Sequence, residues 1–516
     1  MYLSNYLIKN KNKTPNKNLF VFDNEKITYL QFYENVKNII FNLNRIGLKK
    51  GDKIAILSRN NLIIPQLFIV ASYLDLSIVP INISISKKDI EYQLQKINVK
   101  FIFSWKEYLD TLNLNKIKIN KINCYDINSN SKKYNNFKTL LENNNKKFKL
   151  KIKNKISEKN YLYGLTSGST SDPKVVIWSQ EVKILRSLNA KKIYNLKSTD
   201  IILLSTPMYH SISFRLIILP IVIGSTCVIL ENFTKKNWLN SIVKYKISFS
   251  ILVSSQVDMI KNTIKNSKIK SLKTLVSCCS PLNLDVKKKL IKVPRINFFD
   301  TYGASEVGTI TNINLKKEKN KILSNGKVNV SYKVKILHNK KLTNKFNTIG
   351  EICCKTNKTY NSYLYLANKK YINNNESYFK TGDLGYFDKN KYLYLSGRNK
   401  DVIIRAGINI FSADIEKVLN KYYEIKESAV LSNSTDKLGE IILAFVNIKN
   451  KNKININKFY KYCINNLANY QIPSFVYSID EFPRGALNKI SKYNIKKNIF
   501  KYAHKKNLIF NNNPIL

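Results

Sequence analysis

Strands and helices alternate along the first part of the chain, and this alternation limits the folds that the chain can adopt. Apolar, β-prone runs are separated by two helical patterns, one ending near Leu43 and one spanning 62–74. The β-prone runs are 19–22, 27–29, 53–57 and 77–83. This order is typical of a layered α/β fold with a largely parallel sheet. At 516 residues, the chain is long enough for more than one domain.

A second constraint lies in Tyr161–Lys174, YLYGLTSGSTSDPK, where an apolar run leads into a loop of Gly, Ser and Thr that ends in Pro-Lys. Backbone N–H and hydroxyl groups of small residues can converge on phosphate oxygens, and a nearby Lys adds positive charge. A Ser/Thr/Gly-rich run is more often a flexible linker, but a linker seldom follows an apolar strand. Because the spacing differs from the P-loop pattern GxxxxGK[ST], a classical P-loop fold is not indicated.

The formal net charge of +53 at pH 7 suggests, by itself, a polyanionic partner such as nucleic acid or an anionic membrane surface. Only eight of the 87 basic residues are Arg, and the Lys residues are spread along the whole chain. Proteins that read nucleic acids favour clustered Arg. We therefore expect no specific nucleic-acid partner, and only a weak, salt-sensitive affinity for polyanions.

Cysteine usage and hydropathy indicate a reducing compartment and no membrane span. The seven Cys lack the spacing of a disulfide framework, and the adjacent pairs Cys278-Cys279 and Cys353-Cys354 suit neither disulfides nor CxxC metal sites. The longest apolar runs, 62–83 and 216–230, are interrupted by Pro, Asp or Gly, so we expect buried strands and helices. The N-terminus has no apolar signal-peptide core, and we expect a cytoplasmic protein without a transmembrane segment.

Four later windows of the chain resemble motifs of the adenylate-forming, or AMP-binding, superfamily, in particular its acyl-CoA synthetases. The loop TSGSTSDPK is similar to TSGSTGxPK, and YGASE at 302–306 is similar to YGxTE. The run GRNKDVIIRAGINIFSADIE at 397–416 is similar to GRxKDxIxxGGxNIxPxEIE over its whole length, and FPRGALNKISK at 482–492 to LPRxxxGKxxR. The resemblance implies a large N-terminal domain of layered α/β sheets, 1–399, and a small mobile α+β C-terminal domain, 400–516.

The resemblance also implies roles for individual residues. Lys489 and Glu306 would be catalytic, and the Glu306 carboxylate would hold Mg²⁺. His210, in PMYHSISF, would lie at the acyl pocket, and Lys400 would be the hinge. The runs 402–405 and 408–411 would be the two strands of a hairpin, and Gly407, in the turn between them, would lie on the path of CoA. The ATP-binding residues would be Thr166, Ser167, Gly168, Ser169, Thr170, Lys174, Tyr302, Gly303, Asp383 and Arg398.

The chain departs from the family's pattern at a few positions. Cys278-Cys279 replace the two Gly of a turn that lines the adenine site in the family, which narrows the conformational freedom of that turn. Ser171 and Asn488 also stand at Gly positions, and Asn tolerates left-handed backbone geometry best among the other residues. The segment 107–158 is rich in Asn and Lys and poor in apolar periodicity, so we predict a variable surface segment there.

The implied reaction has two half-reactions at one site. A carboxylate attacks the α-phosphate of Mg·ATP to give an acyl-adenylate and pyrophosphate, and the thiol of CoA, the co-substrate, then gives a thioester and AMP. No acidic residue occurs between Ser205 and Leu230 to pair with a substrate ammonium, so a fatty acid or another non-amino acid is expected, with a role in fatty acid metabolism. Two alternatives stay open: a free-standing ligase that loads a carrier-protein phosphopantetheine, and a non-enzymatic polyanion-binding protein with the same fold.

Overall fold

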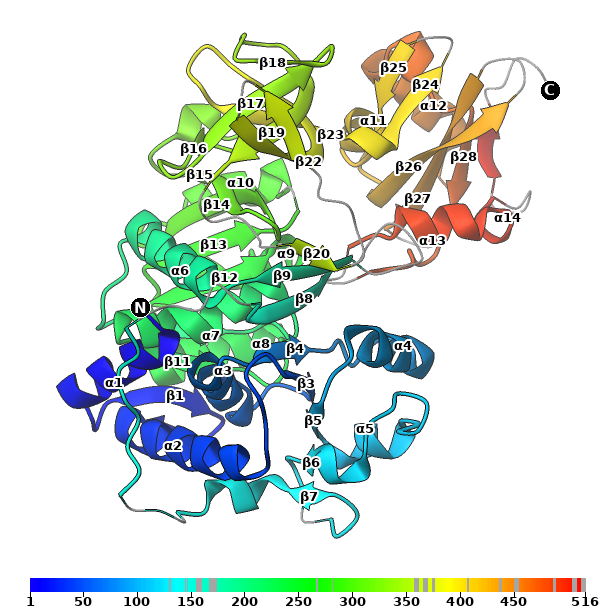
Figure 1. The fold of residues 1–516 in the computed structure, drawn as a ribbon. Coiled ribbons are helices and arrows are strands. Elements are labelled where there is room, and N and C mark those ends of the chain that lie inside the picture. The colour runs from blue at the N-terminus through cyan, green and yellow to red at the C-terminus, as the bar shows by residue number, and fades with distance from the viewer. Residues whose placement is uncertain are drawn as a thin grey trace. The chain divides into compact units, whose positions relative to one another are not determined.

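The computed structural model divides the chain into two compact units, which are considered one at a time (Figure 1). Unit 1 holds the described residues within 1–166, 173–322 and 356–368, and unit 2 those within 323–355 and 369–516. The predicted domain boundary at 399 stays a prediction. The structure describes all residues except 130, 144, 146, 155–159, 167–173, 266–267, 281, 357–361, 365–369, 374–375, 406–407, 436–438, 450–453, 486–488, 504–507 and 512–516.

Two sheets form the framework of unit 1. The first contains, in spatial order, β15 (Gly308–Asn314), β14 (Asn297–Ala304), β13 (Thr274–Cys278), β12 (Phe249–Val253), β10 (Ile201–Leu204), β11 (Thr226–Ile229), β1 (Asn18–Phe22) and β2 (Glu25–Thr28). The second contains β20 (Ser362–Leu364), β9 (Lys174–Trp178), β8 (Leu162–Thr166), β4 (Ser77–Pro80), β3 (Lys53–Leu57), β5 (Phe101–Ser104), β6 (Cys124–Asp126) and β7 (Asn135–Asn136).

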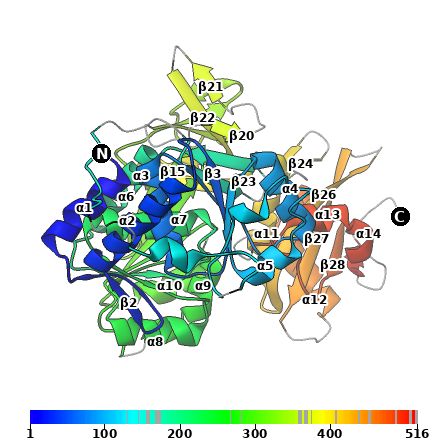
Figure 2. The same ribbon diagram turned by 60° about the horizontal axis from the view of Figure 1, so that its bottom comes forward.

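Helices connect these strands, as the alternating pattern predicts. The helices of unit 1 are α1 (Leu3–Lys13), α2 (Tyr29–Arg45), α3 (Ile63–Leu74), α4 (Lys87–Ile97), α5 (Lys106–Thr111), α6 (Gln180–Tyr194), α7 (Ser211–Ile223), α8 (Lys235–Tyr245), α9 (Ser254–Ile260) and α10 (Leu284–Ile291). Short 3₁₀ turns lie at Lys121–Asn123, Phe137–Leu141, Thr263–Lys265 and Lys319–Lys321. Figure 2 shows α1, α2 and α3 side by side, with α4 close to α5.

The strand pairing of unit 1 is mostly parallel. In the first sheet, β1, β10, β11, β12, β13 and β14 pair in parallel, whereas β2 and β15 join antiparallel at β1 and β14. In the second sheet, every residue of β4 and β5 is buried, as expected for strands covered on both faces.

The apolar runs 62–83 and 216–230 lie in α3, β4, α7 and β11, and no helix in the described part of the chain could cross a membrane.

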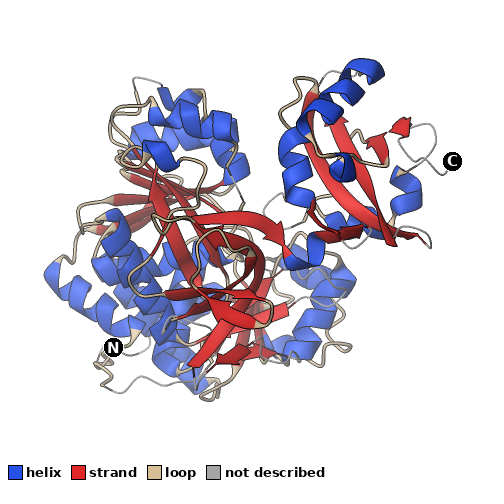
Figure 3. Ribbon diagram, turned by 90° about the horizontal axis from the view of Figure 1, so that it is seen from above, coloured by secondary structure: helices blue, strands red, loops and turns tan. Residues whose placement is uncertain are grey.

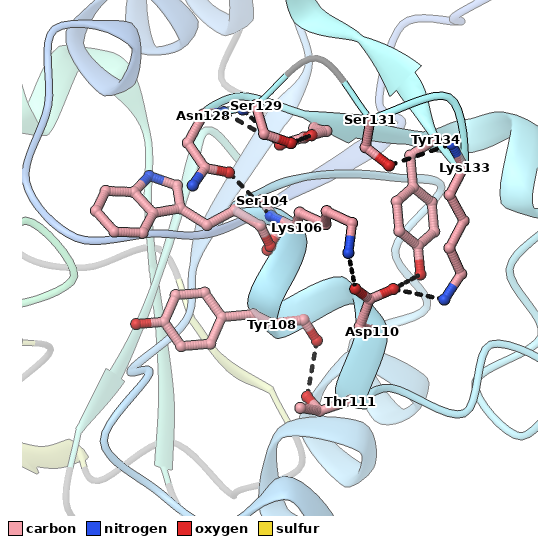
Figure 4. A network of polar contacts seen from close by, with 12 residues as sticks. Ser104, Lys106, Tyr108, Asp110, Thr111, Asn128, Ser129, Ser131, Lys133 and Tyr134 are labelled. Atoms are coloured by element: carbon pink, nitrogen blue, oxygen red, sulfur yellow. Dashed lines mark hydrogen bonds and ion pairs between the residues drawn. The ribbon is translucent and has the colours of Figure 1, made fainter.

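The segment 107–158 contributes to the core, and its prediction as a mere surface segment is wrong. It supplies β6 and β7 to the second sheet, and Leu109, Ile117 and Cys124 belong to a buried apolar cluster that includes residues of α4 and β5. A polar network also holds the segment, because Asp110 accepts from the Lys106 and Lys133 ammonium groups at 2.5 Å each and from the Tyr134 hydroxyl at 3.1 Å (Figure 4). The apolar residues of this segment are too far apart in the sequence to show the period of a helix or a strand, and the sequence pattern therefore did not reveal that they are buried.

Unit 2 contains two sheets. The first has the order β18 (Lys341–Thr343), β17 (Lys333–His338), β19 (Gly350–Lys355), β22 (Glu376–Phe387) and β21 (Lys370–Asn373), and β23 (Leu393–Arg398) pairs with β22. The short strand β16 (Lys327–Val328) precedes them in the chain. The second sheet has the order β25 (Ile408–Phe411), β24 (Val402–Arg405), β27 (Gly439–Ile448), β28 (Phe475–Ser478) and β29 (Leu508–Asn511), and β26 (Ile425–Thr435) pairs with β27.

The second sheet of unit 2 carries helices on its two faces (Figure 3). These helices are α11 (Ser412–Leu419), α12 (Ile456–Asn466), α13 (Lys492–Lys497) and α14 (Ile499–Tyr502), with 3₁₀ turns at Asn399–Asp401 and Asn469–Gln471. Along β27, Ile442, Ala444 and Val446 pack in one apolar cluster with residues of α11 and α12. Ile441, Leu443 and Phe445 pack in another with residues of α13 and α14. This alternation with period two is what a strand buried on both faces requires.

Candidate active site

The end of β14 and the turn that follows it carry Tyr302 and Glu306, which were predicted to bind ATP and Mg²⁺. Tyr302 is buried in β14, and the pairing register shifts between Tyr302 and Gly303. A Cβ at Gly303 would lie 2.0 Å from the carbonyl oxygen of Gly308, so a side chain there would force the two strands apart. Glu306 is half-buried in the turn that follows. The local backbone therefore explains why YGASE needs its Gly at this position.

Two side chains from distant parts of unit 1 hold the backbone of this turn. The Arg186 guanidinium, on α6, donates to the carbonyl oxygen of Ser305 at 2.8 Å and to that of Glu306 at 2.5 Å. The indole N–H of Trp178, at the end of β9, donates to the Ser305 carbonyl at 3.1 Å. Arg186 is only 8% exposed, and its two partly buried hydrogen bonds are charge-assisted, which makes them stronger than bonds between neutral groups. The backbone of the turn that carries Glu306 is thus held in place by hydrogen bonds to its carbonyl oxygens.

Neither anchor was predicted from the sequence. Arg186 is one of eight Arg in a chain whose other basic residues are Lys. A planar guanidinium with several donors can bridge two consecutive carbonyls, which a single ammonium does less well. The presence of an Arg at this position of a Lys-rich chain was therefore the sequence signal for Arg186. That signal does not show which groups the guanidinium contacts. The two carbonyls lie about 120 positions further along the chain, and only the fold brings them to α6.

Trp178 is itself held by close packing against the strand that leads to the predicted phosphate loop. A Cβ at Gly164, in β8, would come within 2.3 Å of the Trp178 ring, so Gly164 makes room for the indole. The Lys183 Nζ atom lies 3.6 Å from the centre of that ring. Burial, followed by the positive charges of Arg186 and Arg215, lowers the pKa of Lys183 well below its ordinary value.

The predicted phosphate loop is bounded by two paired strands. Thr166 ends β8, Lys174 begins β9, and the two residues are cross-strand partners in an antiparallel pair. The predicted strand before the loop is therefore present. The remaining loop residues of the prediction lie outside the described residues: Ser167, Gly168, Ser169 and Thr170.

In unit 2, Asp383 and Arg398 are cross-strand partners on β22 and β23. The Arg398 Nε atom lies 3.3 Å from Asp383 Oδ1. The Asp383 N–H donates to the Thr381 hydroxyl at 3.1 Å. The intervening Gly382 has a φ of +79°, a left-handed conformation that Gly adopts without strain. Its N–H donates to the Glu351 carboxylate at 3.0 Å. The sequence TGD thus forms a tight local turn that orients the aspartate beside the arginine.

The exposed fractions of the two side chains limit the strength of this ion pair. The Arg398 side chain is 54% exposed and the Asp383 side chain 19% exposed. Ion pairs this open to water contribute at most about 1 kcal/mol. Both groups can therefore exchange their mutual contact for a polar ligand at little cost in free energy.

The structure also places the predicted hinge and catalytic lysine positions of unit 2. Lys400 lies in the 3₁₀ turn between β23 and β24, and β24 pairs antiparallel with β25, which confirms the predicted hairpin. Gly407 lies outside the described residues. Lys489 is half-buried in a β-bridged loop where its carbonyl oxygen accepts from the Gly485 N–H at 2.8 Å, next to the bridge between Arg484 and Ile490.

His210 immediately precedes α7, and its ring lies against that of Tyr209, with ring centres 4.6 Å apart. Burial lowers the pKa of His210 to about 4, so the imidazole is neutral at pH 7. No group of three or more His, Cys, Asp or Glu in the described residues is arranged to hold a metal ion.

Comparison with known proteins gives full-length matches. The 2-succinylbenzoate–CoA ligase of Oceanobacillus iheyensis is 26% identical over 500 residues, which cover 95% of this chain and 98% of that protein. Among solved structures, the o-succinylbenzoate CoA synthetase of Bacillus subtilis with its acyl-adenylate intermediate matches with a TM-score of 0.84 at 21% identity, covering 95% of this chain and 98% of that one. The same enzyme in complex with ATP and magnesium ion gives 0.82 at 21% identity, covering 95% and 99%.

These structural matches and a match to a C-terminal domain model confirm the predicted fold class, a mixed α/β protein with a large N-terminal and a smaller C-terminal domain. The model described as "AMP-binding enzyme" matches residues 7–364, and the model described as "AMP-binding enzyme C-terminal domain" matches residues 414–489. Because the first match alone covers more than half of the chain, this protein belongs to the AMP-binding enzyme family.

Proposed function

We propose that this protein is an AMP-forming acid–CoA ligase that activates 2-succinylbenzoate. The observation that carries the proposal is the match over 95% of the chain to a 2-succinylbenzoate–CoA ligase, which is itself covered to 98%. Further ligases with this name match at 25% identity over 96% of the chain. Of the fatty or other non-amino acids expected from the sequence, the proposal chooses an aromatic keto acid, because the relatives are named for it. The expected role in fatty acid metabolism is therefore not proposed.

In the first proposed half-reaction, a carboxylate oxygen of the acid attacks the α-phosphorus of ATP, and the bond to pyrophosphate breaks. The Lys489 ammonium would lie against the developing negative charge, and Thr166, Lys174 and the loop between them would hold the phosphates. Charge neutralisation and positioning, rather than covalent catalysis by the protein, would lower the barrier. Mg²⁺ would supply additional positive charge, and the Glu306 carboxylate, presented by the anchored turn, is a suitable hard ligand.

The nucleotide would be recognised by three further groups. The Tyr302 ring offers a flat apolar face for adenine. The Asp383 carboxylate has two oxygens that can each accept a hydrogen bond from a ribose hydroxyl, and Arg398 lies beside it. The open, weak ion pair between Asp383 and Arg398 supports this role, because neither group has to leave a strong buried contact.

In the second proposed half-reaction, the CoA thiol attacks the acyl carbon of the adenylate, and AMP leaves. Gly407 would lie on the path of the pantetheine arm, and a rotation near Lys400 would exchange the two catalytic arrangements. The neutral imidazole of His210 would face the acyl group, where it can donate or accept a hydrogen bond without placing a charge in an apolar environment.

The decisive experiment measures ATP–pyrophosphate exchange with a panel of acids: 2-succinylbenzoate, benzoate, anthranilate and octanoate. We expect 2-succinylbenzoate to give the highest kcat/KM and to form a thioester when CoA is added. Exchange that is highest with octanoate would overturn the proposed substrate. Thioester formation with a phosphopantetheinylated carrier protein, but not with CoA, would instead support the carrier-protein ligase. An Asp383→Asn variant serves as a control, because it should lose exchange with every acid.

A further inference from the structure

The adjacent thiols of Cys278 and Cys279 are arranged side by side at the end of β13. Their sulfur atoms are 3.8 Å apart, which is van der Waals contact. Cys279 has a φ of +76°, a left-handed conformation that is uncommon for residues other than Gly. In an extended strand, consecutive side chains point to opposite faces. The left-handed residue breaks this alternation and brings both sulfur atoms to the same side.

Hydrogen bonds hold this turn in place. The Ser254 hydroxyl contacts the carbonyl oxygens of Cys278, at 3.3 Å, and of Ser280. The Cys278 thiol lies 3.5 Å from the carbonyl oxygen of Leu252. The two thiols are therefore a pre-organised pair, which reduces the entropy lost when one ligand binds both.

The other cysteines of the chain are less accessible. Cys278 and Cys279 are half-buried, whereas Cys124, Cys227, Cys353, Cys354 and Cys463 are buried. Burial raises the pKa of the Cys124, Cys353 and Cys463 thiols to about 12. Because the thiolate is the reactive form, these buried groups react slowly with thiol reagents. The structure thus singles out one cysteine pair for thiol chemistry.

The geometry points to a chelating dithiol site, Cys278-Cys279, for trivalent arsenicals and similar soft, thiol-seeking metalloids. An arsenic(III) oxide group reacts with the two thiols to form two As–S bonds, and its oxygen leaves as water with both thiol protons, so no oxidant is needed. A disulfide suits the pair less well, because adjacent Cα atoms lie about 3.8 Å apart across a trans peptide, closer than the usual range for disulfides.

The position of this dithiol connects it to the proposed function. Strand β13 pairs in parallel with β14, Ser277 opposite Asp300, and the Thr301 hydroxyl donates to the Ser277 carbonyl at 3.0 Å. Tyr302, the proposed adenine residue, is the next residue of β14. An arsenical bound at the dithiol would therefore stand beside the proposed adenine position. This location, unlike the dithiol itself, rests on the proposed function.

The test treats the full chain with phenylarsine oxide and counts adducts by intact-protein mass spectrometry. We expect one adduct per chain, removed by excess ethanedithiol. Cys278→Ser and Cys279→Gly should each weaken binding by roughly 10²-fold or more, because a second, tethered thiol contributes on that scale. Cys279→Gly should fold normally, since Gly tolerates the left-handed conformation.

The second cysteine pair provides a matched control. Cys353 and Cys354 lie in β19, where consecutive side chains point to opposite faces, so Cys354→Ala should bind phenylarsine oxide as the wild type does. An adduct that is unchanged in Cys279→Gly, or lost in Cys354→Ala, would overturn the dithiol site. Mg·ATP should slow adduct formation. Equal rates with and without Mg·ATP would count against the proposed adenine role of this region and leave the dithiol site standing.

Discussion

Replacement of Arg186 tests whether the anchored turn controls the Glu306 carboxylate. Arg186→Met keeps a long apolar side chain but removes the donors to the Ser305 and Glu306 carbonyls. The Ser305 oxygen would keep the Trp178 indole as a partner, whereas the carbonyl of Glu306 would lose its charged donor. The variant therefore loosens the turn at the residue that is proposed to bind Mg²⁺.

The expected magnitude follows from these hydrogen bonds. A hydrogen bond to a charged group contributes about 1.5–3 kcal/mol, and the loss of one partner in a buried site also leaves a desolvated group. Since one of the two carbonyls keeps a donor, we expect a loss of roughly 3 kcal/mol in the free energy of unfolding. Loss of a preorganised electrostatic contact would lower the exchange rate by about 10²-fold.

The assay is ATP–pyrophosphate exchange as a function of Mg²⁺ concentration. If Arg186 acts by positioning Glu306, Arg186→Met should raise the Mg²⁺ concentration for half-maximal rate, and Arg186→Lys should restore part of the affinity. The control is Arg45→Met, an exposed change in the last turn of α2, which should leave both quantities unchanged. A folded Arg186→Met variant with the Mg²⁺ dependence and rate of the wild type would refute the reasoning.

Five further outcomes are expected. Glu306→Gln should depress exchange severely, and near-normal exchange would remove Glu306 from the Mg²⁺ role. Lys489→Ala should lose adenylate synthesis by roughly 10²–10³-fold yet still make thioester from synthetic acyl-adenylate and CoA. Gly407→Leu should show the opposite pattern, and parallel losses of both half-reactions would contradict domain alternation. Gly303→Ala should lower the melting temperature because its Cβ meets a carbonyl oxygen at 2.0 Å; an unchanged melting curve would argue against this packing. For His210, whose folded pKa is about 4 against an ordinary 6.5, the unfolded chain takes up the proton first. The stability that this group contributes is thus complete above pH 6.5 and is lost as pH falls toward 4. In denaturation curves measured across this pH range, His210→Gln should show a smaller loss of stability than the wild type; an equal loss would argue against this role of His210.

Local patterns in the sequence were sufficient for the fold class and for the position of several motifs. The alternation of strands and helices depends on the period of apolar residues, which a short window contains. The hairpin of β24 and β25 was predicted because two β-prone runs flank a turn. Membership of the AMP-binding family was predicted from four short motifs and is confirmed by family models that cover residues 7–364 and 414–489.

Only the tertiary structure decided which distant groups meet. Arg186 and the Glu306 carbonyl lie 120 residues apart, and no local period encodes their contact, because it arises from the packing of α6 against the β14–β15 turn. The composition of the segment 107–158 predicted a surface segment, yet its scattered apolar residues belong to a buried cluster. The two cysteine pairs are alike as dipeptides, but the left-handed backbone at Cys279 turns one pair into neighbouring thiols, while an ordinary strand separates the side chains of the other. Backbone conformation and long-range packing, which depend on the whole fold, therefore determined the anchors and the dithiol.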